Sequence, residues 1–394
     1  MSLALPIAAS RRGACPSLDA PMQTGDGLLA RIRIAGGRID PVRLEHLAVV
    51  CGTYGNGVIE ITDRGNLQVR GLKPEDVPTF AKAVREIVTV ETGLVVATPP
   101  LAGDDELEFL DPRPLAAEIR RLAEPFANRL GPKVSVVVDG NGQIGLSALK
   151  ADLRLVAADR QRWLISAGAI LLGTTEQPLD SASVVLAALA ALGPTARASD
   201  IEMPALRAVL ADLVEPCALV EPVTSSPIGR FPTSHGMSSG LGLPFGSMAW
   251  EAIAALADGA WRFGITEFRL APHHSLLAMG AAEGLYPEVE ELGFITHPLD
   301  PRRRISACIG SEGCASGHIA ARAVASRLVR SLPAGSTLHV SGCNKGCAHP
   351  RPADVTLVGQ AGGYGLVIHG AAGDTPQAVL RADQLETALS FAQG

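Results

Sequence analysis

The chain has 394 residues, of which 47% are hydrophobic and 19% charged, and this predicts a globular protein of two or three domains. A formal net charge of −6 and an aromatic content of 4% argue against nucleic-acid binding, which normally relies on excess basic charge and stacking side chains. No apolar run reaches the roughly 18 residues of a membrane span, so no membrane partner is expected. Seven cysteines, and no basic segment before the apolar N-terminus, predict reduced thiols and a cytoplasmic protein.

Strands and helices are expected to alternate along the chain. Arg31 and Arg33 stand two residues apart on an expected strand, so their side chains project from one face. The segment 59–71, with the sequence IEITDRGNLQVRG, predicts two short strands joined by a polar turn. Apolar residues at helical spacing predict helices over 115–129 and 316–330.

The second half of the chain repeats the first. Its segment FRLAPHHSLLAMG, at 268–280, aligns without gaps on 59–71, and expected helices precede the two segments at 247–257 and 41–50. A second ungapped match joins 139–157 to 341–359. The two offsets, 209 and 202 residues, nearly agree, so we infer that a unit of about 200 residues was duplicated and fused.

Four cysteines in the second copy form two close pairs, Cys308-Ile-Gly-Ser-Glu-Gly-Cys314 and Cys343-Asn-Lys-Gly-Cys347. Four thiolates in paired spacings, with glycines that let the backbone approach, are typical of iron–sulfur clusters. We therefore predict that the four cysteines ligate one [4Fe-4S] cluster. Structural zinc and unrelated buried cysteines are the alternatives, although zinc sites favour a shorter spacing than the first pair has. The isolated cysteines, expected to be packing residues, are Cys15, Cys51 and Cys217.

The pattern Cys-x5-Cys…Cys-x3-Cys, on the second half of a duplicated chain, resembles the sirohaem-dependent sulfite and nitrite reductases. Thr62-Asp63-Arg64 and Gln68-Val69-Arg70 resemble the segment of that family that contacts the tetrapyrrole. The resemblance implies an α/β (α+β) fold with two ferredoxin-like half-domains and two related α/β domains, the second carrying the cluster. We expect the half-domains at 10–98 and 222–297, the α/β domain without the cysteine motif at 112–215, and the one with it at 302–394.

Finer features resemble one branch of this superfamily, the precorrin-3B synthases. They are RRGACPSLDAPMQTGDGLLARIR at 11–33 and GCNKGCAHP at 342–350. The reductases have two lysines that bind the substrate anion, whereas here Lys133 matches the first and Ser135 stands at the second. The branch implies a monooxygenase that hydroxylates precorrin-3A with O₂ and closes a lactone in aerobic cobalamin biosynthesis, with a mononuclear non-haem iron in addition to the cluster.

Two other functions stay open. One is a sulfite or nitrite reductase with bound sirohaem, and the other is a non-catalytic iron–sulfur or tetrapyrrole-binding protein such as a carrier or sensor. Either enzyme needs an external electron donor, a reductase or a ferredoxin-like protein, because the chain has no convincing GxGxxG nucleotide-binding motif. The sequence assigns no catalytic residue.

Basic residues are the candidates for binding a tetrapyrrole, because its acetate and propionate carboxylates suit the forked guanidinium of arginine. The candidates are Arg31, Arg33, Arg64, Arg70, Lys133 and Lys345, and the last four are expected to face one cleft where the copies meet. For Arg31 and Arg33 the alternative is a solvated strand face, and Arg11 and Arg12 are either tail charges or ligand contacts. His273 and His274 replace Arg64 and Gly65 of the first copy, so they are either iron ligands or ordinary surface histidines.

Overall fold

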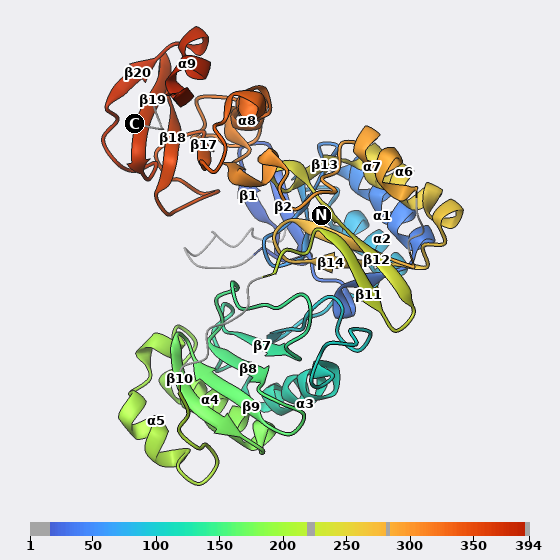
Figure 1. The fold of residues 1–394 in the computed structure, drawn as a ribbon, viewed down its shortest axis with the longest axis vertical. Coiled ribbons are helices and arrows are strands. Elements are labelled where there is room, and N and C mark those ends of the chain that lie inside the picture. Colours follow the sequence, from blue (N-terminus) through green and yellow to red (C-terminus); the bar gives the residue numbers. More distant parts are fainter. Residues whose placement is uncertain (1–15, 219–224, 281–283, 391–394) are drawn as a thin grey trace, which may run out of the picture.

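Four five-stranded sheets form the framework of the computed structural model, which describes residues 16–218, 225–280 and 284–390. Two of the sheets, with the helices that cover them, form a central body. The other two belong to a middle domain, built on strands β6 to β10, and a C-terminal domain, built on β16 to β20. These two domains lie below and above the central body in Figure 1. The α/β fold expected from the sequence is confirmed.

The two sheets of the central body have equivalent strand orders. The first runs β1 (Met22–Thr24), β2 (Gly27–Ile32), β5 (Leu67–Leu72), β4 (Val58–Ile61) and β13 (Ser247–Ala249). The second runs β11 (Gly229–Thr233), β12 (Gly236–Gly242), β15 (Ser275–Met279), β14 (Glu267–Ala271) and β3 (Arg38–Ile39). Their helices are α1 (Pro41–Tyr54), α2 (Val77–Ile87), α6 (Trp250–Asp258) and α7 (Leu285–Glu291).

The two copies exchange one strand each within the central body. β13 precedes α6 in the second copy but pairs antiparallel with β4 of the first, and β3 precedes α1 but pairs antiparallel with β14 of the second. Helices α1 and α6 pack together, and buried side chains such as Leu47, Phe80, Phe268 and Phe294 belong to one hydrophobic core. The two halves therefore bury their apolar surface against each other.

The middle and C-terminal domains repeat one topology. The middle sheet contains β6 (Val95–Ala97), β7 (Ser135–Asp139), β8 (Leu153–Ala157), β9 (Trp163–Ala167) and β10 (Ile170–Thr175), with helices α3 (Pro112–Ala123), α4 (Pro178–Leu192) and α5 (Met203–Val209). The C-terminal sheet contains β16 (Ile305–Ala307), β17 (Leu338–Ser341), β18 (Ala353–Gln360), β19 (Gly363–Gly370) and β20 (Ala378–Leu380), with helices α8 (Ala321–Leu328) and α9 (Leu385–Ser390). In both sheets the first three strands are parallel and the last two antiparallel.

This topology confirms the duplication inferred from the sequence. The aligned segments 59–71 and 268–280 form the hairpins β4–β5 and β14–β15, in which Ile61 pairs with Leu67 and Leu270 pairs with Leu276. The second aligned pair of segments begins at the last residues of β7 and β17, two equivalent parallel strands.

All four expected helices have different ends in the structure, and the one expected over 41–50 continues to Tyr54. The helix expected over 247–257 begins at Trp250, because the three preceding residues pair with β4 as strand β13. The helix expected over 115–129 ends at Ala123, and a 3-10 turn containing Pro125 follows it. The helix expected over 316–330 begins only at Ala321. In the helix expected over 247–257, long-range strand pairing therefore overrides the local helical pattern.

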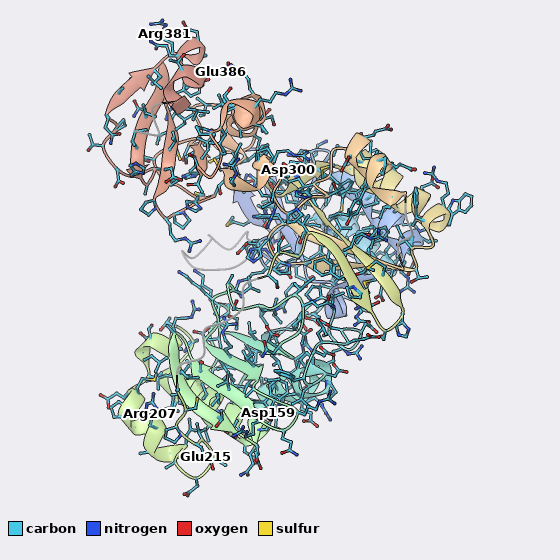
Figure 2. All side chains as sticks on the ribbon, in the orientation of Figure 1. Asp159, Arg207, Glu215, Asp300, Arg381 and Glu386 are labelled. Carbon is cyan, nitrogen blue, oxygen red and sulfur yellow. The ribbon has the colours of Figure 1, made fainter. Side chains whose placement is uncertain are left out.

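The outer parts of the two α/β domains are polar. Exposed charged side chains such as Arg207 and Glu215 in the middle domain, and Arg381 and Glu386 in the C-terminal domain, are labelled in Figure 2. Across the described ranges, no helix combines the length and the apolar character that a membrane crossing requires.

Candidate functional site

The four cysteines of the paired motif come together at one edge of the C-terminal sheet. β16 leads directly into Cys308, and β17 ends two residues before Cys343. Because the two strands are parallel, both segments emerge at the same edge. The backbone N–H of Gly342 donates a hydrogen bond to the Cys308 sulfur at 3.1 Å.

The Cys347 thiol lies within electrostatic range of the other three thiols. Its pKa is raised above the ordinary value first by burial and then by Cys343, Cys308 and Cys314, while Lys345 lowers it. The side chain of Cys347 is exposed, and those of the other three are partly buried. The loops therefore hold all four sulfurs in one region, although the two cysteine pairs are separated by 29 positions in the sequence, from Cys314 to Cys343.

Glycines let the two cysteine loops approach each other closely. Gly310 has a left-handed backbone (φ 68°), and a Cβ there would lie 2.2 Å from the Ile319 carbonyl oxygen. A Cβ on Gly342 would lie 2.8 Å from the Cα of Gly310 and 3.4 Å from the sulfur of Cys308. Four thiolates, close backbone and an N–H bonded to sulfur match the donor set that an iron–sulfur cluster requires. The residues present fit a [4Fe-4S] cluster.

Sites for a single metal ion were expected as well, for zinc as an alternative and for a mononuclear iron. Over the described ranges, no three His, Cys, Asp or Glu side chains converge closely enough to hold one ion. The mononuclear iron therefore has no ligand set among those residues.

The turn between β1 and β2 packs against the second cysteine of the first pair. A Cβ on Gly25 would lie 2.3 Å from the backbone nitrogen of Ala315. Beside this contact, the buried guanidinium of Arg70 pairs with Asp26 at 3.1 Å and donates to the Gly313 carbonyl at 2.8 Å. Arg70 therefore joins the central body to the residue before Cys314, and contact between Arg70 and a tetrapyrrole stays a prediction.

The middle domain has an ion-pair network where the C-terminal domain has Cys314. Asp104 follows the last residue of β6 by seven positions, as Cys314 follows the last residue of β16. The Asp104 carboxylate accepts a hydrogen bond from buried Arg269 and lies 3.6 Å from Arg38 and 3.4 Å from His235. The ion pairs of Asp104 thus tie the middle domain to the central body, and the hydrogen bond from Arg70 to Gly313 is one link between the central body and the C-terminal domain.

A row of polar side chains crosses the first sheet of the central body toward α8. Arg31 donates to the Gln68 side-chain oxygen at 3.1 Å, and the Gln68 nitrogen donates to Glu60. Glu60, only 7% exposed, also accepts a hydrogen bond from Arg322 in the first turn of α8. Arg31 and Gln68 are direct partners across β2 and β5, as are Gln68 and Glu60 across β5 and β4. This row of hydrogen-bonded side chains connects Arg31, a candidate for binding the tetrapyrrole, to α8, the helix that follows Cys314.

The remaining basic candidates lie at separate places. Arg33 donates to the carbonyls of Glu91 and Gly93, and exposed Arg64 donates to the carbonyl of Lys150 in the middle domain. Exposed Lys133 precedes β7 by two residues, and Lys345 donates to the Ser316 hydroxyl at 2.9 Å. Arg70 and Lys345 thus contact the Cys314 loop, whereas Arg64 contacts the middle domain. Arg11 and Arg12 lie outside the described residues.

The adjacent histidines join the hairpin turns of the two copies. His273 and His274 both have left-handed backbones, at φ 57° and 60°. The His273 ring is 3.0 Å from the Asp63 carboxylate, and the His274 ring is 2.6 Å from the Ile61 carbonyl. The hydrogen bond from His273 is the main cause that lowers the pKa of Asp63. These contacts give both histidines a role in joining the copies.

Three acidic residues of this region, Asp26, Glu60 and Asp104, were not among the sequence-based candidates. For Glu60 the hairpin contains a signal, because a five-residue turn between Ile61 and Leu67 makes Glu60 and Gln68 direct neighbours. Asp26 and Asp104 pair with arginines far away in sequence, and no local pattern identifies such partners.

Comparison with known folds agrees with this architecture. Residues 20–87 match the family model described as the nitrite/sulfite reductase ferredoxin-like half domain. The solved structure titled "Structure of Mycobacterium tuberculosis NirA protein" matches with a TM-score of 0.67 and 20% identity, covering 91% of this chain and 79% of that one. This likeness shows the fold.

Comparison with curated proteins separates two degrees of similarity. A precorrin-3B synthase from Sinorhizobium sp is 38% identical, over 98% of this chain and 88% of that protein. A sulfite reductase (ferredoxin) 2 from Mycolicibacterium paratuberculosis is 23% identical, over 84% of this chain and 70% of that protein. A ferredoxin–nitrite reductase from Synechococcus elongatus is 24% identical, over 84% of this chain and 76% of that protein. The similarity to the synthase is both higher and more complete.

Proposed function

The chain belongs to the precorrin-3B synthase family, within the superfamily of sulfite and nitrite reductases, and we propose that it oxidises precorrin-3A with O₂ in aerobic cobalamin biosynthesis. The observation that carries this proposal is 38% identity to a precorrin-3B synthase over nearly the whole chain. The reaction is hydroxylation of the macrocycle and closure of a lactone from a ring acetate. One oxygen atom enters the substrate, and the other leaves as water after uptake of two electrons and two protons.

Cys308, Cys314, Cys343 and Cys347 would hold the [4Fe-4S] cluster of this enzyme, since their loops fit it. When bound, such a cluster supplies electrons one at a time. The protein supports it through the Gly342 N–H on the Cys308 sulfur and through Arg70, which fixes the loop before Cys314. A mononuclear non-haem iron is a further expectation from the family resemblance, but the described residues offer no ligand set for it. More than four irons per chain in the purified protein would support it.

The tetrapyrrole carboxylates require cations that remain accessible. Arg64 is exposed, and Arg31 is partly buried at the end of the polar row. We infer that these two residues contact the substrate, with Gln68 orienting the Arg31 guanidinium. Lys345, exposed beside the cysteines, is the third cation in this assignment.

The test supplies anaerobically purified protein with precorrin-3A and a chemical reductant, with and without O₂, and follows the product by mass. The expected product gains oxygen only in the aerobic reaction, and ¹⁸O₂ provides the label. Sirohaem bands in the isolated protein, together with sulfite or nitrite turnover and unchanged precorrin, would identify the protein as a reductase and not as a synthase. Binding of the tetrapyrrole without any turnover would indicate a carrier.

A further inference from the structure

We propose that His339 is a positioning residue of the cysteine site, whose ring N–H donates a hydrogen bond to sulfur when the [4Fe-4S] cluster is bound and thereby raises the reduction potential of the cluster. The inference rests on the proposed function, because it concerns the cluster that the four cysteines would hold. It adds a residue outside the cysteine loops, on the strand that leads into the second pair.

His339 is completely buried within the C-terminal sheet. It lies on β17, where it pairs with Ser306 of β16 and Thr356 of β18, and its exposed fraction is 0%. Neither ring nitrogen has a hydrogen-bond partner among the described residues. A buried polar atom without a partner is costly, and the great majority of such atoms in folded proteins have one. The imidazole therefore indicates a partner that binds at this place.

Burial also fixes the charge of this ring. Burial, and to a smaller extent the nearby ring of His349, lower the pKa of His339 to about 4. The ring is therefore neutral near pH 7, with one nitrogen that carries a proton and one that does not. A neutral imidazole can donate one hydrogen bond to a thiolate or sulfide without placing a positive charge in the interior.

The Cys343–Cys347 loop lies over this imidazole. A Cβ on Gly346, the residue before Cys347, would lie 3.7 Å from the Cε1 atom of His339. The ring of His349, two residues after Cys347, meets the His339 ring edge-on, with 5.7 Å between the centroids. The imidazole therefore lies against the loop both before and after its second cysteine.

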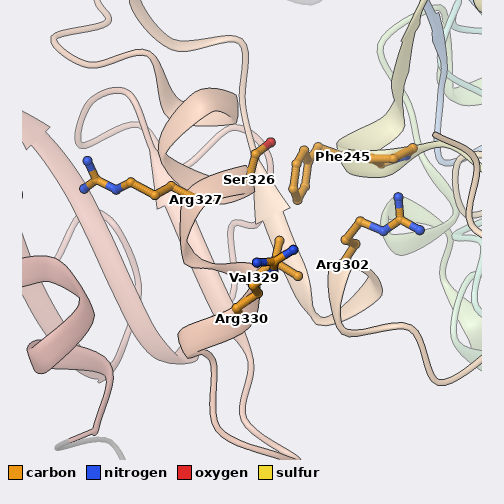
Figure 3. Close-up of a pocket in the computed structure, with 7 residues that line it drawn as sticks. Phe245, Arg302, Ser326, Arg327, Val329 and Arg330 are labelled. Atoms are coloured by element: carbon orange, nitrogen blue, oxygen red, sulfur yellow. The ribbon is translucent and has the colours of Figure 1, made fainter. Parts of the chain in front are cut away.

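The opposite face of the sheet is apolar and is covered by α8. Leu338 and Val340, the neighbours of His339 on β17, belong to the hydrophobic core that includes this helix. Because successive side chains of a strand point to opposite faces, His339 points away from α8. It does not line the pocket of about 570 Å³ at the end of this helix, which Figure 3 shows with Phe245 and Val329 among its walls. The imidazole therefore faces the side of the sheet on which the Cys343–Cys347 loop lies.

The first copy of the chain has an apolar side chain at the equivalent place. Val137 lies two residues before the end of β7, as His339 lies two residues before the end of β17. Their partners on the next strand, Arg154 and Thr356, are 202 positions apart, the same offset as between Val137 and His339. Val137 packs in a small apolar cluster with Leu146. The fold thus accepts a valine under this loop, and the imidazole occurs in the domain that has the cysteine motif.

A hydrogen bond to sulfur favours the reduced cluster. Reduction adds negative charge that is shared by the sulfur atoms, and hydrogen bonds to these atoms are one of the factors that set the potential. An N–H group stabilises the more negative state more strongly, and in a buried site the effect is little screened by water. The Gly342 N–H, at 3.1 Å from the Cys308 sulfur, is one such donor, and His339 would supply a second.

The experiment compares the midpoint potential of the cluster in the wild-type chain and three variants, by redox titration with EPR detection. His339→Leu removes the N–H, and His339→Gln keeps a side-chain N–H. His369→Asn, the control, removes an exposed imidazole of the same sheet, at a left-handed φ of 50° that asparagine tolerates.

We expect His339→Leu to make reduction of the cluster about tenfold less favourable, which corresponds to about 59 mV for one electron. His339→Gln should recover most of this shift, and His369→Asn should leave the potential unchanged. If His339→Leu retains no iron, cluster retention takes the place of the potential, and His339→Gln should then hold iron and acid-labile sulfide.

A second measurement uses the full chain without its cluster. Leucine removes two buried nitrogens that have no partner among the described residues, so cluster-free His339→Leu should melt at the same temperature as the cluster-free wild type or higher. A histidine with only a structural role in the sheet would give the opposite pair of results, a lower melting temperature and an unchanged potential.

The role of His339 is overturned if His339→Leu has the potential of the wild type, or if His339→Gln behaves like His339→Leu. Iron and sulfide analysis of the wild-type protein tests the cluster separately. A normal cluster with an unchanged potential in His339→Leu would reject this inference alone, whereas a wild-type protein without sulfide would reject the cluster as well.

Discussion

At one position the two copies of the chain differ in a way that separates their roles. Asp104 follows the end of β6 by seven residues, as Cys314 follows the end of β16, and it pairs with buried Arg269. This carboxylate ties the middle domain to the central body, whereas the Cys314 thiol lies near the other cysteines at the edge of the C-terminal sheet. The two related domains therefore differ at this edge: one has an ion-pair network, and the other has the cysteine loops.

The cysteines give the first prediction at the scale of the residue. Changing Cys343 to Ser removes one of four thiolates, so the purified protein should lose iron and acid-labile sulfide together and lack the cluster signal in EPR spectra after reduction. Cys217→Ser is the matched control, because Cys217 is exposed and lies in the middle domain. One zinc per chain with no sulfide in the wild-type protein would contradict the cluster.

Substrate binding gives a second prediction. A charge-assisted hydrogen bond contributes about 1.5–3 kcal/mol, so Arg64→Ala should weaken precorrin-3A binding roughly tenfold to a hundredfold. Arg121→Ala, with a side chain 72% exposed on α3, is the control and should bind normally. Fluorescence or absorbance titration of the tetrapyrrole measures both. Equal affinities of the two variants would exclude Arg64 from the binding surface.

Glu108 gives a third prediction, which concerns pH. Burial raises the pKa of this carboxyl from 4.5 to about 7, so the folded chain holds the proton more tightly than the unfolded chain does. The stability that Glu108 contributes is fully present below about pH 4.5 and is lost as the pH rises through about 7. Glu108→Gln should therefore flatten the fall of the unfolding free energy across this range.

Urea denaturation at several pH values measures this slope. Glu106→Gln is the control, because Glu106 is an exposed neighbour in the same loop. If the wild type and Glu108→Gln have the same dependence on pH, the raised pKa is wrong.

At the scale of the element, the cysteine loop and α8 behave as one unit. The N–H of Ser311 donates to the Ile319 carbonyl at 2.8 Å, and the N–H of His318 donates to the Gly342 carbonyl at 2.8 Å. Residues 316–320, which were expected to be helical, are therefore used to pack the first cysteine pair against the second. The delayed start of α8 follows from this packing.

A substitution at Gly310 tests whether the cysteine loop and α8 depend on their close packing. An Ala at this position would place its Cβ 2.2 Å from the Ile319 carbonyl oxygen and 2.5 Å from the Ala321 nitrogen, so the loop must separate from α8. We expect Gly310→Ala to reduce cluster retention and lower the melting temperature. Gly335→Ala is the control, because Gly335 has a similar left-handed φ of 82° with nothing within 4 Å.

The control isolates backbone strain from the clash. Gly335→Ala should cost only about 1–2 kcal/mol, the penalty of a left-handed alanine, and should keep its iron. Iron content and thermal melting of both variants decide the matter. Equal loss of iron in the two proteins would show that the close approach at Gly310 is unimportant.

At the scale of the whole molecule, the exchanged strands make the two halves of the central body interdependent. A protease site placed after exposed Ala218 allows the purified chain to be cut between the copies. Because β3 and β13 cross between halves and α1 packs on α6, both fragments should elute together in gel filtration. Separation should require denaturant. Fragments that part in native buffer would contradict a shared core.

The sequence by itself determined the features that depend on short spacing or internal repetition. The paired cysteines and their glycines predicted a common site for the four thiols, and two ungapped matches revealed the duplication before any strand was seen. The length of the turn in the hairpin 59–71 was also enough to make Glu60 and Gln68 direct neighbours across its two strands. Each of these signals lies within one segment or compares a segment with its copy, so no long-range contact was needed to read it.

Only the tertiary structure decided which basic residues lie together and which strands change partners. Arg70 and Arg64 are six residues apart in sequence, yet one is buried against Asp26 beside the cysteine loop and the other is exposed and bonded to the middle domain. The residues of β13 resemble in composition those of the helix that follows them. The sequence therefore could not predict that they pair with β4 as a strand. Such choices are made by packing between segments roughly two hundred residues apart, and local propensity carries no information about a distant partner.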